Sequence, residues 1–165
     1  MKGYKAFKKG LVCKGKQYAE NTVFEENSYA KIGSAGDLAK IGSSGDGVQI
    51  GSSGDGVQIG SFGDLAKIGS SGDGALIGSS GDGAQIGSSG DGAQIGSSGE
   101  NAVICCAGHG CHVKARKGSW ITLAEWGSKD GTYIPLCVKT EYVDGERIKE
   151  DTFYCLKNGE FCEVN

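Results

Sequence analysis

Apolar and polar positions alternate in short segments through the middle of the chain. Between residues 30 and 101, eight nine-residue units follow one another without a gap, and typical units read AKIGSSGDG, VQIGSSGDG and AQIGSSGDG. Each unit begins with a small apolar residue, a longer residue and Ile, as in Ala39-Lys40-Ile41. Alternation with a period of two is typical of a short strand with one buried face. The Gly, Ser and Asp residues that follow predict a turn.

A strand of this length cannot bury its Ile alone, but a stack of strands about 4.8 Å apart can. Nine extended residues span only about 30 Å, which is too short a perimeter to close a coil. The sequence therefore predicts an all-β fold, a flat β-solenoid of nonapeptide repeats with two units, about 18 residues, in each coil. One Ile from each unit is expected to fill the interior: Ile32, Ile41, Ile50, Ile59, Ile68, Ile77, Ile86 and Ile95.

The two ends of the chain predict caps for this solenoid. Residues 1–29 hold short segments rich in strand formers, which we interpret as an N-terminal β cap that covers an open strand edge. The solenoid itself is predicted over residues 30–119. Residues 120–165 predict a C-terminal antiparallel β-meander cap, in which Trp120 closes the interior column of small residues as a lid.

Two hairpin turns are expected within this C-terminal segment. Asp144-Gly145 and Asn158-Gly159 are each flanked by strand formers, and such dipeptides favour two-residue hairpin loops.

Charge and cysteine content narrow the function classes. The net charge of −3 divides into +3 over residues 1–29, −5 over the eight units and −1 over the remainder. An acidic repeat argues against direct binding of nucleic acid through phosphates. The chain has no apolar run near eighteen residues and no apolar leader, so neither a membrane span nor a signal peptide is predicted. Seven cysteines, an odd number, favour reduced thiols in a cytoplasm.

The ends also carry a family resemblance. The opening MKGYKAF…CKGKQYAENTVFEE and the ending KGSWITLAEW…VKTEYVDGERIKEDTFYCLKNGEF resemble uncharacterised phage and prophage proteins of gut anaerobes, which carry similar IGSSG nonapeptides between the same ends. The resemblance implies a phage-derived repeat protein and implies no activity. Longer members have a Cys/His-containing segment after the N-terminal hairpin, whereas here Glu26 leads almost directly into Ala30.

The candidate binding residues are the acids of the repeat. They are Asp37, Asp46, Asp55, Asp64, Asp73, Asp82, Asp91 and Glu100. With two units per coil they form two columns on opposite edges of the solenoid. Either each Asp holds its own corner through side-chain hydrogen bonds, or the columns are an acidic surface for a basic protein. Together they present about one charge per 2.4 Å, against about one per 1.7 Å for duplex DNA, which would permit crude mimicry of nucleic acid.

Other chemistries fit the sequence less well. Calcium-binding nonapeptides place a large apolar residue two positions after Asp, whereas here Ile comes four positions after it. The segment from Cys105 to His112 also includes Cys106, His109 and Cys111, but its spacing matches no common zinc motif. We interpret this segment as a degenerate final coil. A catalytic Cys-His pair is not favoured either, because no acid is placed to orient the His. Ice-binding solenoid faces present threonine rows, which this repeat does not contain.

These observations favour a phage-encoded, non-enzymatic interaction protein in the host-cell cytoplasm. Its expected partner is a protein with a basic surface, a host defence nuclease or other nucleic-acid-handling factor that it would inhibit in the manner of anti-CRISPR or anti-restriction proteins. No cofactor or metal is expected. Two alternatives remain open, a structural or assembly component of a phage particle and a metal-dependent enzyme that uses the Cys/His segment.

Overall fold

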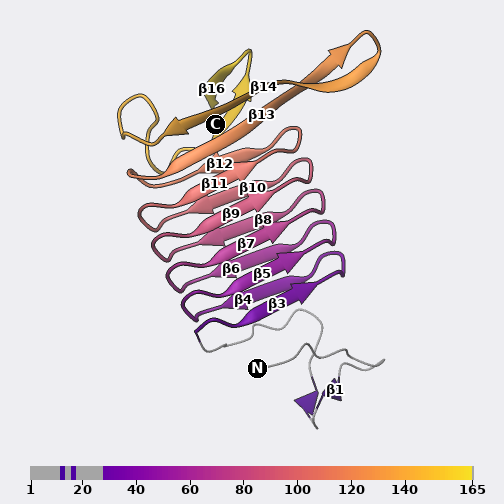
Figure 1. Ribbon diagram of the computed structural model, residues 1–165, viewed down its shortest axis with the longest axis vertical. Coiled ribbons are helices and arrows are strands. Elements are labelled where there is room, and N and C mark those ends of the chain that lie inside the picture. The colour runs from indigo at the N-terminus through magenta and orange to yellow at the C-terminus, as the bar shows by residue number, and fades with distance from the viewer. Residues whose placement is uncertain (1–11, 14–15, 18–27, 165) are drawn as a thin grey trace.

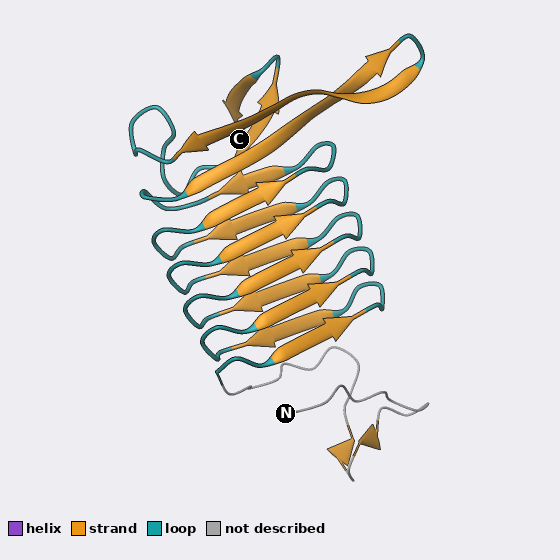
Figure 2. Ribbon diagram, in the orientation of Figure 1, coloured by secondary structure: helices purple, strands orange, loops and turns teal. Residues whose placement is uncertain are grey.

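The computed structural model describes residues 12–13, 16–17 and 28–164. This part of the chain is all-β, and its repeats stack into a β-solenoid with two facing sheets (Figures 1 and 2). The predicted fold class is therefore confirmed. Within the predicted N-terminal cap, the structure describes β1 (Val12–Cys13) and β2 (Lys16–Gln17), which pair antiparallel; the rest of that cap up to residue 27 lies outside the described residues.

Each sheet has seven strands, and successive strands of the repeat alternate between the two sheets. Sheet I contains β3 (Lys31–Ser34), β5 (Gln49–Ser52), β7 (Lys67–Ser70), β9 (Gln85–Ser88), β11 (Val103–Cys106), β13 (Trp120–Lys129) and β14 (Thr132–Tyr142). Sheet II contains β4 (Lys40–Ser43), β6 (Gln58–Ser61), β8 (Leu76–Ser79), β10 (Gln94–Ser97), β12 (His112–Lys114), β15 (Tyr154–Lys157) and β16 (Glu160–Glu163).

The register places identical repeat positions beside one another. Ile32 pairs with Ile50 and Ile50 with Ile68, so one coil contains 18 residues, as the sequence predicted. The strands of the repeat pair in parallel, because each returns to its own sheet after one full coil. Stacked identical residues form continuous columns, and every coil buries its apolar residues against the next one.

The core lies between the two sheets. In most repeat strands the exposed fraction alternates along the chain, so that Ile and the following Ser point inward while the residue before Ile and the Gly after it point outward. Ile68 is 4% exposed and Ala66 is fully buried. The inward serines form two further columns, and the buried hydroxyls of six of them have no hydrogen-bond partner: Ser52, Ser61, Ser70, Ser79, Ser88 and Ser97.

The C-terminal strands are antiparallel, as predicted, but they divide between the two sheets. β13 continues sheet I by pairing in parallel with β11, and β14 then pairs antiparallel with β13. β15 pairs antiparallel with β12, and β16 with β15, so these two strands continue sheet II. The segment consists of two hairpins that cover the end of both sheets, and β14 and β15 do not pair (Figure 1).

Trp120 does not close the interior, because the coils continue beyond residue 101 and the stretch 111–118 has eight residues where a unit of the repeat has nine. Ile104 and Val113 are nine positions apart, but the next member of the inward Ile position is Ile121, which is only eight residues further on and pairs with Ile104. Trp120 therefore pairs with Val103 in the outer row and remains 48% exposed, while Ser119 is buried. The predicted lid was wrong, since a shift of one residue moves a side chain to the other face of a sheet.

One of the two predicted hairpin turns is confirmed. Asn158 and Gly159 join β15 to β16 and both have positive φ, 52° and 72°, as a type I′ turn requires. Asp144-Gly145 does not form a hairpin turn, because the chain leaves β14 at Tyr142 and starts β15 only at Tyr154. Asp144 instead organises the intervening loop by accepting backbone hydrogen bonds.

Candidate interaction surfaces

The acidic residues of the repeat form two columns, one along each edge of the solenoid. The first acidic column contains Asp37, Asp55, Asp73 and Asp91, in the corners that follow strands of sheet I; the second contains Asp46, Asp64, Asp82 and Glu100, in the corners that follow strands of sheet II. Neighbours in one column are 18 residues apart. All eight residues are exposed.

Each Asp of these columns is bonded to the next coil. Oδ1 of Asp37 accepts a hydrogen bond from the backbone N–H of Asp55 at 3.0 Å, and the same bond repeats up the first column as far as the N–H of His109. In the second column the bonds reach the N–H of Glu100, with lengths of 2.7–3.0 Å. The sequence-based interpretation placed such bonds within a single corner, whereas the structure places them between coils.

The bonds between coils outweigh the repulsion between neighbouring acids. Two charges about 4.8 Å apart repel by about 0.9 kcal/mol in water. A hydrogen bond to a charged group contributes about 1.5–3 kcal/mol. Among the described residues, Oδ2 of these aspartates makes no hydrogen bond, so that oxygen faces solvent. The columns are thus structural ladders that also present ordered negative charge.

The backbones of neighbouring coils approach each other closely at the Gly that precedes each acid, so a larger residue does not fit there. A Cβ placed on Gly72 would collide with the backbone of Gly54 in the preceding coil. The residue after each acid adopts a positive φ, as at Gly74, where φ is 65°. Two of the non-Gly residues in this position, Leu38 and Leu65, also have φ of 56°. This backbone is unfavourable for Leu, so the surrounding corner must impose it.

The two leucines each lie above a Gly of the following coil. A Cβ on Gly56 would be 2.7 Å from Cδ2 of Leu38, and one on Gly83 would be 2.8 Å from Cδ2 of Leu65. A side chain at Gly56 or Gly83 would therefore displace the Leu of the preceding coil.

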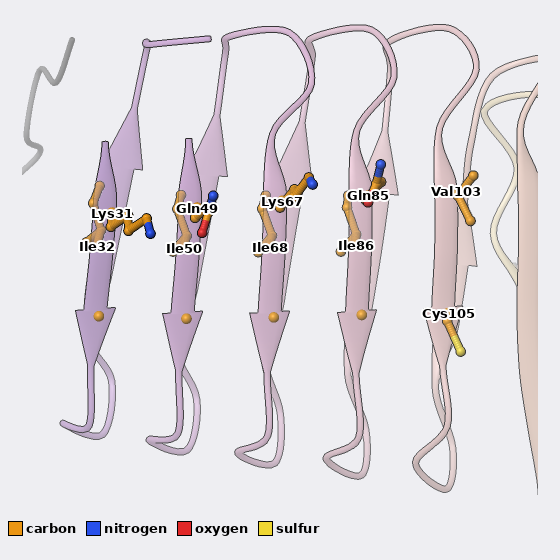
Figure 3. A pocket seen from close by; sticks show the side chains of 14 residues that line it. Lys31, Ile32, Gln49, Ile50, Lys67, Ile68, Gln85, Ile86, Val103 and Cys105 are labelled. Carbon is orange, nitrogen blue, oxygen red and sulfur yellow. The ribbon is translucent and has the colours of Figure 1, made fainter. Parts of the chain in front are cut away.

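The outer face of sheet I carries a shallow groove along the solenoid axis. The groove is lined by a row of outward side chains, which Figure 3 labels, and by a column of glycines, which we call its floor. The row is Lys31, Gln49, Lys67, Gln85 and Val103, and the floor is Gly33, Gly51, Gly69 and Gly87. A Cβ on any of these four glycines would meet nothing within 4 Å. The floor is therefore exposed backbone.

The corresponding groove on sheet II is interrupted at its C-terminal end. The side chain of Lys114 extends over Gly96, and its Nζ lies 5.0 Å from the centre of the Phe153 ring. Phe62, which is 70% exposed, adds an aromatic side chain to the same groove. The two faces of the solenoid therefore differ, although the repeat that builds them is nearly the same.

The structure separates the residues of the Cys/His segment. Cys105 pairs with Gly87 on the outer face of sheet I, whereas Cys106 pairs with the inward Ser88. Cys111 is 3% exposed in the core, and His109 lies in the corner that continues the first acidic column. In the described part of the chain, no group of three or more His, Cys, Asp or Glu residues is arranged to hold a metal ion. The segment continues the coil, as predicted.

Cys106 and Cys111 contact one another across this corner. A hydrogen bond between their thiols, with burial as a second cause, raises the pKa of Cys106 above its usual range. The thiol of Cys111 also lies 3.5 Å from the carbonyl oxygen of Gly90. A buried thiol with a raised pKa is a poor nucleophile.

An aromatic cluster on the β13–β14 hairpin lies against the corner of the solenoid that follows β11. Nε1 of Trp126 donates a hydrogen bond of 2.8 Å to the carbonyl oxygen of Ala107. Tyr133 stacks on Trp126 with ring centres 5.8 Å apart and meets the ring of His109 edge-on at 5.6 Å. The sequence pattern does not reveal this cluster, because its members meet only through the β13–β14 pairing and the position of that hairpin beside the corner of His109.

Glu125 links the two C-terminal hairpins. Its carboxylate accepts the backbone N–H groups of Asn158 at 2.8 Å and Gly159 at 2.7 Å. These N–H groups belong to the turn between β15 and β16, so one side chain of sheet I fixes the turn of sheet II. The Asn-Gly turn was recognisable from the sequence, but its carboxylate partner was not.

Charged side chains form a network beneath β14. Lys139 pairs with Glu160 at 3.1 Å and with Glu141 at 3.5 Å, and Glu141 also contacts Arg147. The hydrogen bond from Arg147 holds the pKa of Glu141 below its usual range. The carboxylate of Glu160 raises the pKa of Lys139. These shifts favour the charged forms of Lys139 and Glu141.

In comparisons with known proteins, no family model, no curated protein and no solved structure matches the chain. Among the described residues, no helix is long and apolar enough to cross a membrane.

Proposed function

We propose that this protein is a non-enzymatic interaction protein whose acidic edges bind a basic protein surface. The proposed partner is a host defence factor that handles nucleic acid, and the protein would inhibit it from within the host cell, in keeping with its resemblance to phage proteins. The observation that carries the proposal is the pair of acidic columns. Their charges are repeated at a fixed spacing and held in place by hydrogen bonds to the backbone.

The Asp side chains of the columns are held in fixed positions, and this supports binding because less side-chain entropy is lost on association. An exposed acid on a mobile loop loses side-chain freedom when it pairs with a basic residue. Here each Asp is already fixed by its bond to the next coil, so less freedom remains to be lost. Within a column the charges are about 4.8 Å apart, against about 3.4 Å for phosphates along one strand of DNA. One edge of the solenoid is therefore a coarse substitute for one nucleic-acid strand.

The charge of the edges is least compensated toward the C-terminal half of the repeat. The three lysines of the repeat are Lys31, Lys40 and Lys67. From residue 68 to residue 101 the repeat has no basic residue, whereas Asp73, Asp82, Asp91 and Glu100 all fall there. The partner is expected to contact these coils.

The test begins with a partner captured from host lysate and identified by mass spectrometry. Binding of the full chain to that partner should weaken steeply with salt, because opposed charge arrays attract through screened fields. DNA or guide RNA should compete for the partner, while the free protein should bind neither. A partner that binds equally well at low and high salt, or that binds nucleic acid and this protein together, contradicts the proposal.

Variants of the two columns locate the contact. Replacing the four acids of the first acidic column with Asn preserves an oxygen that accepts the N–H of the next coil and removes the charge. A matched variant does the same for the second acidic column. Because the columns lie on opposite edges, a single groove in the partner should be affected by one variant and not by the other. Equal effects would indicate a partner that surrounds the rod, and no effect from either variant would exclude the acidic edges.

Two other functions have weaker support. A structural or assembly component of a phage particle requires only a stiff rod, and the continuous backbone ladders of the solenoid supply one. A metal-dependent enzyme that uses the Cys/His segment is less favoured, because Cys106 is buried in the core while Cys105 faces outward. Metal analysis of protein purified without chelator tests the metal-dependent enzyme, because a stoichiometric metal would support that function.

A further inference from the structure

The outermost strand of sheet I pairs on one side only within the described part of the chain. β14 is the last strand of that sheet and, with 11 residues, the longest strand in the described part of the chain (Figure 1). It pairs only with β13 among the described residues. An edge strand exposes N–H and C=O groups that can pair with another chain.

Hydrogen bonding to β13 determines which residues face the open edge. The N–H of Val143 donates to the carbonyl oxygen of Ser119 at 2.9 Å. In an antiparallel pair these bonds occur at every second residue. Lys139 and Glu141 therefore direct their backbone groups toward β13, together with Val143. The backbone groups of the residues between them are directed outward: Val138, Thr140 and Tyr142.

The two halves of β14 differ in how well the edge is protected. Its first half contains Pro135, and the register with β13 shifts opposite this half, at Glu125 and Trp126. Proline and bulges are the features with which natural proteins block edge strands. The second half, from Val138 to Tyr142, contains no proline and no bulge. Val138 is 64% exposed and Tyr142 is 40% exposed.

We propose that this half of β14 pairs with the same strand of a second copy of the chain. The two strands would run antiparallel about a two-fold axis at Thr140. Val138 of one copy then lies opposite Tyr142 of the other, and Lys139 lies opposite Glu141. An apolar residue beside an aromatic one, and opposite charges across a pair of strands, both stabilise a sheet.

Charge selects this register over its neighbours. Residues whose backbone groups face the open edge must lie opposite residues of the same kind in the other copy. The register can therefore shift only in steps that keep such residues opposite one another. The next register in one direction places Lys139 opposite its own copy, and the next in the other direction places Glu141 opposite its own copy. Like charges directly opposite one another destabilise a pair of strands. Only the register about Thr140 makes both pairs complementary.

The charged side chains of this register already belong to a network. Lys139 and Glu141 lie on the inward face of β14, where their side chains are 3.5 Å apart and are 32% and 13% exposed. In the proposed dimer the same two residue types meet again across the interface, so the network continues from one copy into the other without an unpaired charge. The interface is isologous, as a two-fold dimer requires.

Pairing would join two solenoids end to end through a continuous sheet. Each copy contributes a sheet of seven strands, and the N-terminal ends of the two rods point away from each other. The proposal rests on the edge of β14 and not on the acidic columns, so it stands or falls independently of the proposed function.

The test is a charge exchange measured by sedimentation equilibrium over a range of concentrations. The wild-type full chain should dimerise. Lys139→Glu alone and Glu141→Lys alone each create two like-charge pairs, so each variant should dimerise at least about tenfold more weakly. An equimolar mixture should recover the dimer, because every pair in the mixed dimer is again complementary. A melting curve of each variant checks that the fold survives.

A second pair of variants tests the backbone edge without changing charge. Thr140→Pro removes an N–H that faces the open edge, so it should abolish the dimer and preserve the hairpin. Thr140→Ala retains that N–H and should still dimerise. A wild-type chain that remains monomeric at all concentrations overturns the proposal. So does a dimer that tolerates Thr140→Pro, or a mixture of the charge variants that fails to associate.

Discussion

The backbone N–H of Asp73 donates a hydrogen bond of 2.9 Å to Oδ1 of Asp55, one coil earlier in the chain. Asp55 in turn donates its own N–H to Asp37. Each Asp is thus a donor through its backbone and an acceptor through its side chain. This double role makes the acids part of the solenoid framework, whatever they bind.

Changing these acids to Asn should therefore cost much less stability than changing them to Ala. The amide oxygen of Asn accepts the same N–H, and the loss of charge also relieves repulsion between neighbours. We expect Asp55→Asn with Asp73→Asn to change the free energy of unfolding little. Asp55→Ala with Asp73→Ala should lose about 1–3 kcal/mol for each acceptor, reduced by solvent at these exposed sites. Denaturant unfolding of both double variants measures the difference, and equal losses would show that the ladder is not stabilising.

A second prediction compares two glycines that are close in sequence. Gly72 approaches the backbone of Gly54, whereas Gly69 has open space above it on the outer face of sheet I. We expect Gly72→Ala to disrupt the stacking of the coils and to lower expression or melting temperature severely. Gly69→Ala should retain the fold, because Ala adds no collision and suits an extended strand better than Gly. The comparison is made by thermal melting, and two equally tolerated changes would contradict the close approach of the two coils at Gly72.

The contrast between these two glycines shows how far the sequence predicts the fold. A strict period of nine fixes which residues stack, and alternation fixes which face each occupies, so Ile68 and its column were predictable. The period does not reveal why a given Gly is required, since Gly69 and Gly72 recur equally often. Only the distance between coils shows that Gly72 is needed for close backbone contact, whereas Gly69 is not.

Prediction failed where the period changes. The stretch 111–118 is one residue shorter than a unit of the repeat, so Trp120 lies in the outer row and not in the interior. The partners of Glu125 were also beyond prediction, because they are 33 and 34 residues away in the sequence and no periodicity connects them. The acidic columns themselves followed directly from the repeat, but the bond of each Asp to the next coil depends on side-chain geometry.

The buried serines lead to a third prediction. Ser70 is 7% exposed and its hydroxyl has no hydrogen-bond partner. Burying an unpaired hydroxyl costs about 1–3 kcal/mol, and Ala fills nearly the same space without that cost. We expect Ser70→Ala to leave stability unchanged or to raise it.

Ile68→Ala, in the same strand, is the matched control for the serine. It removes a large apolar side chain from the core and should cost about 2–5 kcal/mol. Both variants are compared with wild type by denaturant unfolding. A marked loss with Ser70→Ala would mean that the hydroxyl has a partner after all, such as a buried water.

The last prediction concerns the loop between β14 and β15 and its dependence on pH. Oδ1 of Asp144 accepts the backbone N–H groups of Glu146, Arg147 and Ile148 at 2.8–3.0 Å. These bonds, led by the one from Glu146, lower the pKa of Asp144 below its usual value of about 3.9. A carboxyl group whose pKa is lower in the folded state stabilises the fold fully above its unfolded pKa. That contribution is lost as the pH falls through the folded pKa, because the proton then occupies the group that accepts the bonds.

The variant Asp144→Asn isolates the contribution of Asp144 to the pH dependence of stability from that of the other acids. Asn still offers an oxygen to the loop but cannot titrate, so the variant should lose less melting temperature than wild type when the pH is lowered from about 5 to about 2. At neutral pH the order should be reversed, with wild type more stable, because a charged acceptor binds N–H groups more strongly than a neutral one. Glu146→Gln, which changes a neighbouring charge without removing an acceptor of the loop, should follow the wild-type curve. If wild type and Asp144→Asn lose melting temperature in parallel over this range, protonation of Asp144 does not contribute to acid unfolding.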